Sequence, residues 1–356
     1  MRIILLFTGD TFLSVNSDRN CLSNSPFSAS IVDLFRASNN VCVNLETTVG
    51  TGGVKVAKAY NFQAFPDSLK YLTQNRVNVC SLANNHSLDF GEDGLKQTIR
   101  YLKEEGIGFI GTEECNRKDI IASGKKVRIC SYYGNQKGIA RINKQEILND
   151  IYHHKSEVDY VFVCLHWGEE YVAYPSLEQQ QMAHAFVDAG ANAVIGHHPH
   201  VMQGYEEYHG GYIFYSLGNF NFFVDHPYAK KLVETTKAYC VGFEINDAGD
   251  IQYQIIPINI NDNWQPEVIT DENEKSRFHN YIELISNPLE TGITNSFYLT
   301  EVAPHYFKNH LPSWKKRVKN YGFGHLGEMV KWLIHPITYK YYAGMIMSLF
   351  HKTVRY

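Results

Sequence analysis

Residues 193–200 read Ala-Val-Ile-Gly-His-His-Pro-His, and this stretch, with others like it, decides the fold. Its first half is a short apolar run, which is typical of a buried strand. Its second half places three histidines within four positions, directly after that strand. His198 and His200 stand two residues apart, so in an extended segment their side chains would point the same way. Three histidines so placed are costly to hold without a ligand, and the stretch therefore predicts a metal site.

The same pattern, an apolar strand that ends in polar residues, recurs along the chain. Strands are expected at Ile3–Thr8, Val41–Leu45, Val77–Leu82, Lys126–Ser131, Tyr160–Leu165, Ala193–Ile195, Tyr212–Ser216, Ala238–Ile245 and Ile251–Ile258. The polar residues that follow or end five of these strands are Asp10, Glu46, Asn85, His86, His166, His198 and His200. Open α/β sheets present their ligands at the carboxyl ends of strands, so we expect these side chains to gather at one edge.

Amphipathic stretches separate many of the expected strands and end at glycine. Helices are expected over Glu92–Glu105, before Gly106, and over Leu177–Ala189, before Gly190. Ser176 and the residues after it fit a capping box at the start of the second helix. Alternating strands and helices favour an α/β sandwich in which helices cover the sheets.

Charge is distributed unevenly along the 356 residues. The net charge is -4, yet the segment from Glu301 onward carries nine basic and two acidic residues. We place a domain boundary in the polar stretch Asn261–Asn273, which gives a main domain over residues 1–262 and a basic, aromatic-rich, mainly helical extension over residues 263–356. This extension is expected either to pack on the main domain as a helical lid or to meet a membrane surface or a partner protein.

The chain shows no secretory leader and no apolar run of membrane-spanning length. Five of its seven cysteines occur inside apolar runs, and none forms a CxxC pair, which is typical of buried free thiols in a reducing compartment. We therefore expect a cytoplasmic protein, with peripheral contact to the inner membrane face through its basic end. No P-loop, GxSxG or GxGxxG pattern stands in a suitable context, and no nucleic-acid partner is expected.

Carboxylate, amide and imidazole ligands together suit Mn, Zn or Fe better than Ca or Mg. We expect one or two such divalent ions. Asp89 either orients His86 through a hydrogen bond or caps the helix expected to start near Glu92. Asn219, at the end of another strand, is a further candidate that could contact the substrate or simply form a turn.

Six motifs together resemble the bacterial capsule-synthesis CapA family, associated with poly-γ-glutamate capsule, within the calcineurin-like metallophosphoesterases. They are Gly9-Asp10, Asn44-Leu45-Glu46, Ala83-Asn84-Asn85-His86 with Asp89, His166-Trp167-Gly168-Glu169, Gly196-His197-His198-Pro199-His200 and Tyr215-Ser216-Leu217-Gly218-Asn219-Phe220. The resemblance covers residues 3–260 and implies a four-layer α-β-β-α sandwich of the metallophosphoesterase type, with a helical C-terminal extension.

The resemblance also implies a role for each matching residue. Metal one would be bound by Asp10 and His200, with Glu46 in the place of the bridging carboxylate. Metal two would be bound by Asn85, His166 and His198. His86 would be the general acid that protonates the leaving oxygen.

The chain departs from the superfamily pattern in its first motif. Phe12 stands where the superfamily carries a metal-binding histidine, and Glu46 is one methylene longer than the usual aspartate. Metal one is therefore expected to be weak, differently liganded or absent, and Glu169 or His197 could substitute as ligands.

Three functions follow as hypotheses. The first is a metal-dependent phosphoester hydrolase in capsular or extracellular polymer biosynthesis, the polymer being poly-γ-glutamate or a polysaccharide, with capsule-synthesis proteins as partners. The second is a γ-glutamyl amide hydrolase, because a bound metal polarises carbonyl and phosphoryl oxygens alike. The third is a non-catalytic assembly or polymer-binding subunit. Phe12 favours the third, whereas the retained Asn85-His86 and His198-Pro-His200 disfavour it.

Overall fold

The computed structural model describes residues 3–13, 25–58, 60–222, 233–246 and 248–297. The basic segment from Glu301 onward lies outside the described residues, and so do the lid packing, the membrane contact and the partner contact predicted for it as alternatives. Within the described ranges, no helix is both long and apolar enough to cross a membrane. The cytoplasmic location stays a prediction.

The first sheet has eight strands in the order β16-β15-β14-β1-β2-β5-β6, with β13 paired to β1. Its strands are β1 (Leu5–Thr11), β2 (Val41–Leu45), β5 (Val79–Ser81), β6 (Gly108–Ile110), β13 (Asn219–Asn221), β14 (Lys237–Ile245), β15 (Ile251–Ile260) and β16 (Pro266–Val268). The strands β1, β2, β5 and β6 run parallel. Their carboxyl ends therefore share one edge of the sheet.

The second sheet has six strands in the order β11-β12-β10-β9-β8-β7. Its strands are β7 (Arg117–Ala122), β8 (Lys125–Tyr133), β9 (Tyr160–His166), β10 (Ala193–His197), β11 (Tyr205–Tyr208) and β12 (Gly211–Phe214). The central strands β8, β9, β10 and β12 are parallel. A separate pair, β3 (Thr48–Val49) and β4 (Gln63–Ala64), lies beside the first sheet.

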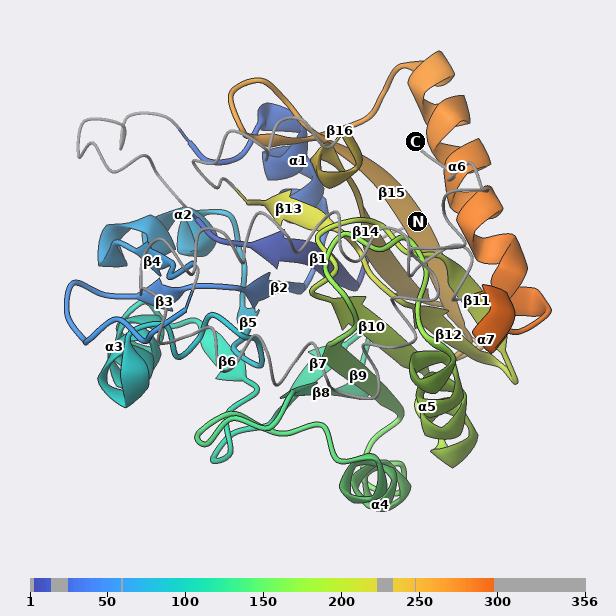
Figure 1. The fold of residues 1–356 in the computed structure, drawn as a ribbon, viewed down its shortest axis with the longest axis horizontal. Coiled ribbons are helices and arrows are strands. Elements are labelled where there is room, and N and C mark those ends of the chain that lie inside the picture. The colour runs from blue at the N-terminus through green and yellow to red at the C-terminus, as the bar shows by residue number, and fades with distance from the viewer. Residues whose placement is uncertain (1–2, 14–24, 59, 223–232, 247, 298–356) are drawn as a thin grey trace.

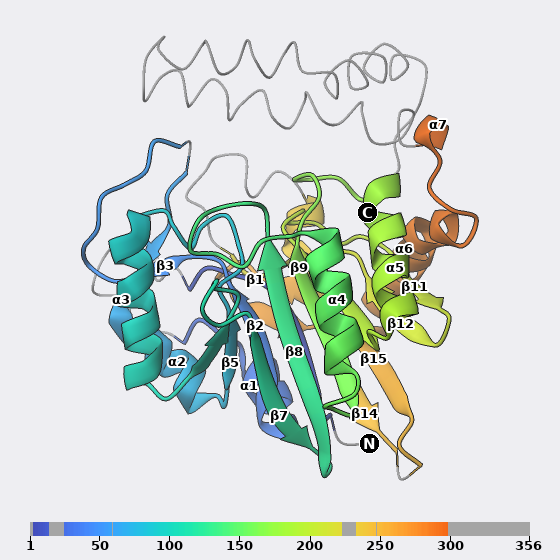
Figure 2. The same ribbon diagram turned by 90° about the horizontal axis from the view of Figure 1, so that it is seen from below.

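Five helices cover the outer faces of the sheets: α1 (Ala29–Ala37), α2 (Leu69–Gln74), α3 (Gly91–Glu104), α4 (Lys144–His154) and α5 (Leu177–Ala189). The described residues also form the helices α6 (Glu272–Glu290) and α7 (Asn295–Phe297), and short 3-10 turns at Pro66–Ser68 and Val233–Thr236. Figure 1 shows α1, α2 and α3 against the first sheet, and Figure 2 shows α4 and α5 on the opposite flank. The predicted four-layer α-β-β-α sandwich is confirmed.

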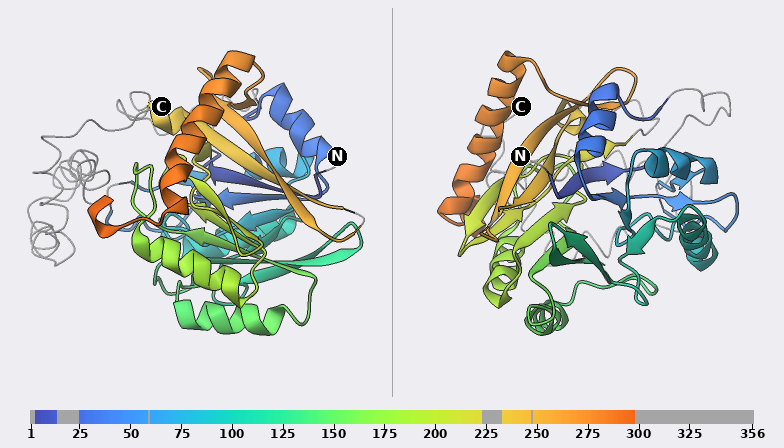
Figure 3. Two further views of the ribbon diagram at one scale, coloured as in Figure 1. Left: turned by 90° about the vertical axis from the view of Figure 1, so that its right-hand side faces the viewer. Right: turned by 180° about the vertical axis from the view of Figure 1, so that it is seen from behind.

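Successive side chains of a strand point to opposite faces of its sheet, so each strand contributes to two different apolar cores. The described residues form three such cores. In β1, Leu5 and Phe7 enter the core between the sheets, whereas Leu6 faces the core under α1, α2 and α3. A third core lies between the second sheet and α4 and α5. The helix α6 inserts Phe278 and Ile285 into the core between the sheets. Figure 3 shows α6 lying along the outside of β15 and β11.

Most expected elements occur, with shifted ends. The helix over Leu177–Ala189 has the predicted bounds and its capping box. Strand β1 runs to Thr11, beyond the predicted Thr8, because Asp10 and Thr11 pair with β2 and β13. Five cysteines in the expected strands are buried and free: Cys42, Cys80, Cys130, Cys164 and Cys240. The domain boundary at residue 262 stays a prediction, although β16 in that stretch pairs with β15.

Candidate metal centre

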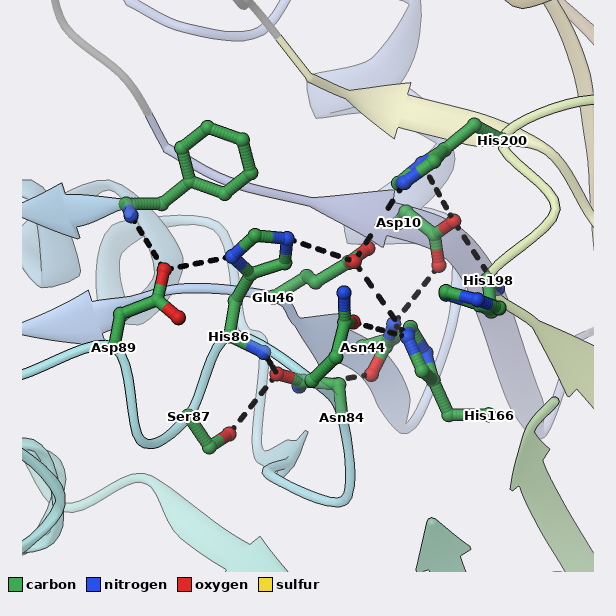
Figure 4. Close-up of polar contacts among 12 residues, drawn as sticks. Asp10, Asn44, Glu46, Asn84, His86, Ser87, Asp89, His166, His198 and His200 are labelled. Atoms are coloured by element: carbon green, nitrogen blue, oxygen red, sulfur yellow. Dashed lines mark hydrogen bonds and ion pairs between the residues drawn. The ribbon is translucent and has the colours of Figure 1, made fainter. Parts of the chain in front are cut away.

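The carboxyl ends of strands from both sheets meet at one place. Asp10 lies in β1, Glu46 directly follows β2, and His166 ends β9. Parallel pairing sets Asp10 opposite Asn44 and His166 opposite His197. Figure 4 shows the side chains of Asp10, Glu46 and His166 converging with those of His86, His198 and His200.

Glu46 lies at the centre of this group. Its side chain is fully buried, and its Oε1 lies 3.5 Å from His166 Nε2, 3.7 Å from His200 Nε2 and 3.8 Å from His86 Nε2. Among the described residues, neither of its carboxylate oxygens has a hydrogen-bond partner. Burial raises the pKa of Glu46 well above its usual value, and the charge of Asp10 raises it further. A buried carboxylate without a donor is costly, and a bound cation would remove that cost.

Two sets of possible ligands share Glu46. Glu46, His198 and His200 form one set, and Asp10, Glu46 and His166 form the other, with ligand atoms within 4.8 Å of one another in each set. Carboxylate oxygens with imidazole nitrogens suit Zn, Mn or Fe. The residues present therefore fit one or two divalent ions, with Glu46 common to both positions.

Asp10 is held from two sides. Its Oδ1 accepts from Asn44 Nδ2 at 2.8 Å, and its Oδ2 lies 3.3 Å from both His200 Nδ1 and the backbone N of His198. Burial acts to raise the pKa of Asp10, but the hydrogen bond and charge of His200 outweigh burial and lower it. Burial acts to lower the pKa of His200, yet Glu46 and Asp10 raise that pKa to about 10.

The segment after β10 does not continue as a strand. His198 has φ 101° and His200 has φ 58°, so the extended segment predicted for these two residues is wrong. Positive φ is strained for residues other than glycine, and such strain concentrates at functional sites. The turn still brings both rings to Glu46. His198 Nδ1 is buried and has no hydrogen-bond partner among the described residues.

His86 pairs with Asp89 at the edge of the group. Its Nδ1 lies 2.7 Å from Asp89 Oδ2, and because a carboxylate only accepts, Nδ1 carries the proton. Its Nε2 faces Glu46. Burial lowers the pKa of His86 to about 4, and the charge of Lys58 adds to that effect. Asp89 is not the cap of the following helix, since α3 begins at Gly91 and Phe90 occupies the cap position.

Asn85 and His166 contact each other. His166 Nε2 lies 2.7 Å from Asn85 Oδ1, and His166 Nδ1 lies 3.3 Å from Asn44 Nδ2. Burial lowers the pKa of His166 well below its usual value, and neighbouring His198 lowers it further. His166 is therefore a neutral imidazole, which is the form that binds a metal.

The three additional candidates have different positions. His197 Nε2 lies 3.0 Å from the carbonyl oxygen of Thr8, and His197 belongs to neither ligand set. Asn219 Oδ1 accepts from His200 Nδ1 at 2.9 Å, so it orients that ring. Glu169 is half-buried; burial lowers the pKa of His198, and the charge of Glu169 offsets a small part of that lowering.

Two residues that contact the candidate site received no role from the sequence. Asn44, quoted within a motif, orients both Asp10 and His166. Lys58 reaches His86 and Asn85 from the irregular segment between β3 and β4. No apolar strand precedes Lys58, so the pattern that found the other residues could not find it.

Aromatic rings form one wall of the site. Phe12 packs against Phe62 with ring centroids 4.5 Å apart and against Phe222 at 5.8 Å. Phe62 lies 4.1 Å from the His86 ring, and Phe222 lies 4.7 Å from the His200 ring. Phe12 thus fills the space beside the ligands with an apolar ring.

Comparison with known proteins agrees with these features. The family described as bacterial capsule synthesis protein PGA_cap matches residues 4–223, which include all the candidate ligands. Capsule biosynthesis protein CapA of Bacillus anthracis is 33% identical over 245 residues, covering 63% of this chain and 58% of that protein. PGA biosynthesis protein CapA of Bacillus subtilis is 30% identical over 247 residues, covering 64% of this chain and 63% of that protein.

The chain thus spans less than two thirds of the length of these curated relatives. Among solved structures, a novel phosphatase from Mycoplasma pneumoniae is a distant likeness, with a TM-score of 0.46 and 14% identity. The match covers 78% of this chain and 97% of that phosphatase.

Proposed function

The chain belongs to the bacterial capsule synthesis protein PGA_cap family, and from that premise we propose that it is a metal-dependent phosphoester hydrolase serving capsular or extracellular polymer synthesis. One observation carries the metal-dependent part. The fully buried carboxylate of Glu46 has no donor among the described residues and is surrounded by imidazoles. The polymer context rests on the family and on its named relatives.

Five residues would hold the metal: Asp10, Glu46, His166, His198 and His200. Asn85, whose Oδ1 lies 2.7 Å from His166 Nε2, stays a predicted sixth ligand. A bound divalent ion would polarise a phosphoryl oxygen and screen its charge. Asn44 and Asn219 would keep two of these ligands in place through the hydrogen bonds that they make to Asp10 and His200. Such outer partners fix ligand orientation in metal sites.

His86 would move the proton. Asp89 holds the proton of the neutral ring on Nδ1, so the unprotonated Nε2 faces the site, where it would take a proton from the attacking water and then pass that proton to the leaving oxygen. The rings of Phe62 and Phe222 pack beside His86 and His200 and restrict the access of water on that side. The substrate is proposed to be a phosphoester met during polymer synthesis, and the partners are proposed to be other capsule-synthesis proteins.

The test is hydrolysis by purified full-length protein supplied with Mn or Zn. The substrates are p-nitrophenyl phosphate, bis-p-nitrophenyl phosphate and a γ-glutamyl anilide. We expect nitrophenol release that falls at least about 100-fold in His86→Ala, since general acid catalysis contributes roughly 100- to 10,000-fold. His184→Ala is the matched control, because His184 pairs with Glu206 away from the site.

Each other outcome contradicts the proposal in a definite way. Cleavage of the anilide alone would replace it with an amide hydrolase. No turnover by folded, metal-loaded protein would favour a non-catalytic subunit, in which Phe12 closes the site. Equal loss in His86→Ala and His184→Ala would show that the activity does not come from this centre.

A further inference from the structure

Asp89 connects His86 to the irregular segment between β3 and β4. Its fully buried carboxylate accepts from His86 Nδ1 at 2.7 Å and from the backbone N of Phe62 at 2.5 Å. Its backbone carbonyl accepts from Val56 N at 3.0 Å and from Asn61 Nδ2 at 3.2 Å. Residues of this segment therefore converge on a single acid beside the metal centre.

Lys58 completes this connection. Its ammonium group forms an ion pair with Asp89 Oδ1, donates to the carbonyl oxygen of Asn85 at 2.7 Å, and lies 3.2 Å from His86 Nδ1. The Lys58 side chain is 23% exposed, whereas Asp89 is fully buried. The cation thus reaches inward from the rim of the site to a carboxylate that has no access to water.

The contact with His86 restricts the imidazole. An ammonium group cannot donate to a ring nitrogen that already carries a proton. Lys58 therefore sits beside Nδ1 and holds Oδ1 of Asp89, while Oδ2 accepts from His86 Nδ1 and from the backbone N of Phe62. With Nδ1 fixed in this way, Nε2 points to Glu46, as Figure 4 shows.

We propose that Lys58 is a positioning residue of this site, which fixes Asp89 and Asn85 and so holds the His86 imidazole with Nε2 toward the reacting atoms. The inference rests on the proposed hydrolase function. In this role Lys58 contacts neither the substrate nor the metal. It predicts that losing the ammonium group lowers turnover without changing metal content or substrate affinity.

The experiment compares Lys58→Met with Lys55→Met in full-length, metal-loaded protein. Lys55 lies in the same segment but is exposed, with its ammonium group over the Phe90 ring. We expect kcat of Lys58→Met to fall about 10- to 100-fold, because a small misplacement of a catalytic group can cost roughly 100-fold in rate. KM for bis-p-nitrophenyl phosphate and bound metal should stay unchanged, and Lys55→Met should match wild type. Lys58→Arg, which keeps the cation, should recover most of the lost kcat.

Several results would overturn the assignment. One is kcat of Lys58→Met equal to wild type. Another is a rise in KM alone, which would make Lys58 a substrate-binding group. Loss of metal together with activity would make it a support for the ligands. If Lys58→Met does not fold, Lys58→Gln and Lys58→Arg give the same comparison between a neutral and a cationic side chain.

The positioning role of Lys58 can also be tested without any hydrolase activity. If wild type hydrolyses none of the esters, crystal structures of metal-loaded wild type and Lys58→Met decide. A His86 ring turned away from Asp89 in Lys58→Met supports the positioning role. A ring that keeps its Asp89 contact in both proteins overturns it.

Discussion

Arg128 and Glu46 are both ionisable residues in the interior, Arg128 almost fully buried and Glu46 fully buried, yet their surroundings differ. Arg128, in β8, donates Nε and Nη2 to the two carboxylate oxygens of Asp119, at 2.7 and 2.8 Å. It also donates Nη1 to Glu157 at 2.5 Å and contacts His154. Glu46 has three imidazoles within 3.8 Å of Oε1 but no hydrogen-bond partner among the described residues.

The difference separates a structural cluster from a binding site. Around Arg128, the protein itself supplies every opposite charge, and the hydrogen bond from Arg128 lowers the pKa of Asp119 to about 2. Around Glu46, burial raises the carboxyl pKa instead. A buried group whose partner is missing from the protein points to a ligand, whereas a satisfied group points to stability.

The largest expected effect is a loss of hydrolysis in a variant of Glu46 that a variant of Arg128 does not share. Glu46→Gln should lower phosphodiester hydrolysis at least about 100-fold, because even outer partners of metal ligands cost roughly 10- to 100-fold. Arg128→Met, assayed in parallel, should keep kcat within about twofold, since Arg128 only serves stability in this account. Equal losses in the two variants would mean that Glu46 acts through folding alone.

The second expected effect is stabilisation by metal. At free Mn or Zn roughly 1,000 times Kd, binding to the folded state alone should add about 4 kcal/mol to the free energy of unfolding. Urea denaturation with and without a chelator measures this difference. Wild type and Arg128→Met should both show it, and Glu46→Gln should lose most of it. A chelator without effect on wild type would contradict the metal site.

The third effect is on the stability of the metal-free protein. Arg128→Met should lower the free energy of unfolding by about 2 kcal/mol, the typical worth of hydrogen bonds to charged groups. Metal-free Glu46→Gln should be at least as stable as metal-free wild type, because it removes a buried carboxylate that has no hydrogen-bond donor among the described residues. Loss of stability in Glu46→Gln would show that Glu46 has a stabilising partner within the protein.

The smallest effect depends on pH. The pKa of Asp119 is lowered from 3.8 to about 2, first through the hydrogen bond from Arg128. A lowered folded-state pKa contributes stability that is complete above about pH 4 and is lost as pH falls toward 2. Between pH 5 and pH 3, wild type should therefore lose more stability than Asp119→Asn, as measured by urea denaturation. Parallel losses in the two proteins would contradict the pairing.

The strand-end pattern predicted much of this arrangement from sequence. Asp10, Glu46, His166 and the histidines after β10 do meet, because parallel strands bring their carboxyl ends together. The pattern could not predict the left-handed backbone at His198 and His200, since Pro199 between them suggests only an extended path. It also could not find Lys58, whose position depends on tertiary contacts with Asp89.

Elemental analysis of purified protein tests the central claim most directly. Wild type, Glu46→Gln and Arg128→Met would be loaded with Mn or Zn, desalted and measured by mass spectrometry. The account predicts one or two ions per chain in wild type and Arg128→Met, and loss of most of that metal in Glu46→Gln. Wild type without metal after loading, or Glu46→Gln with as much metal as wild type, would contradict it.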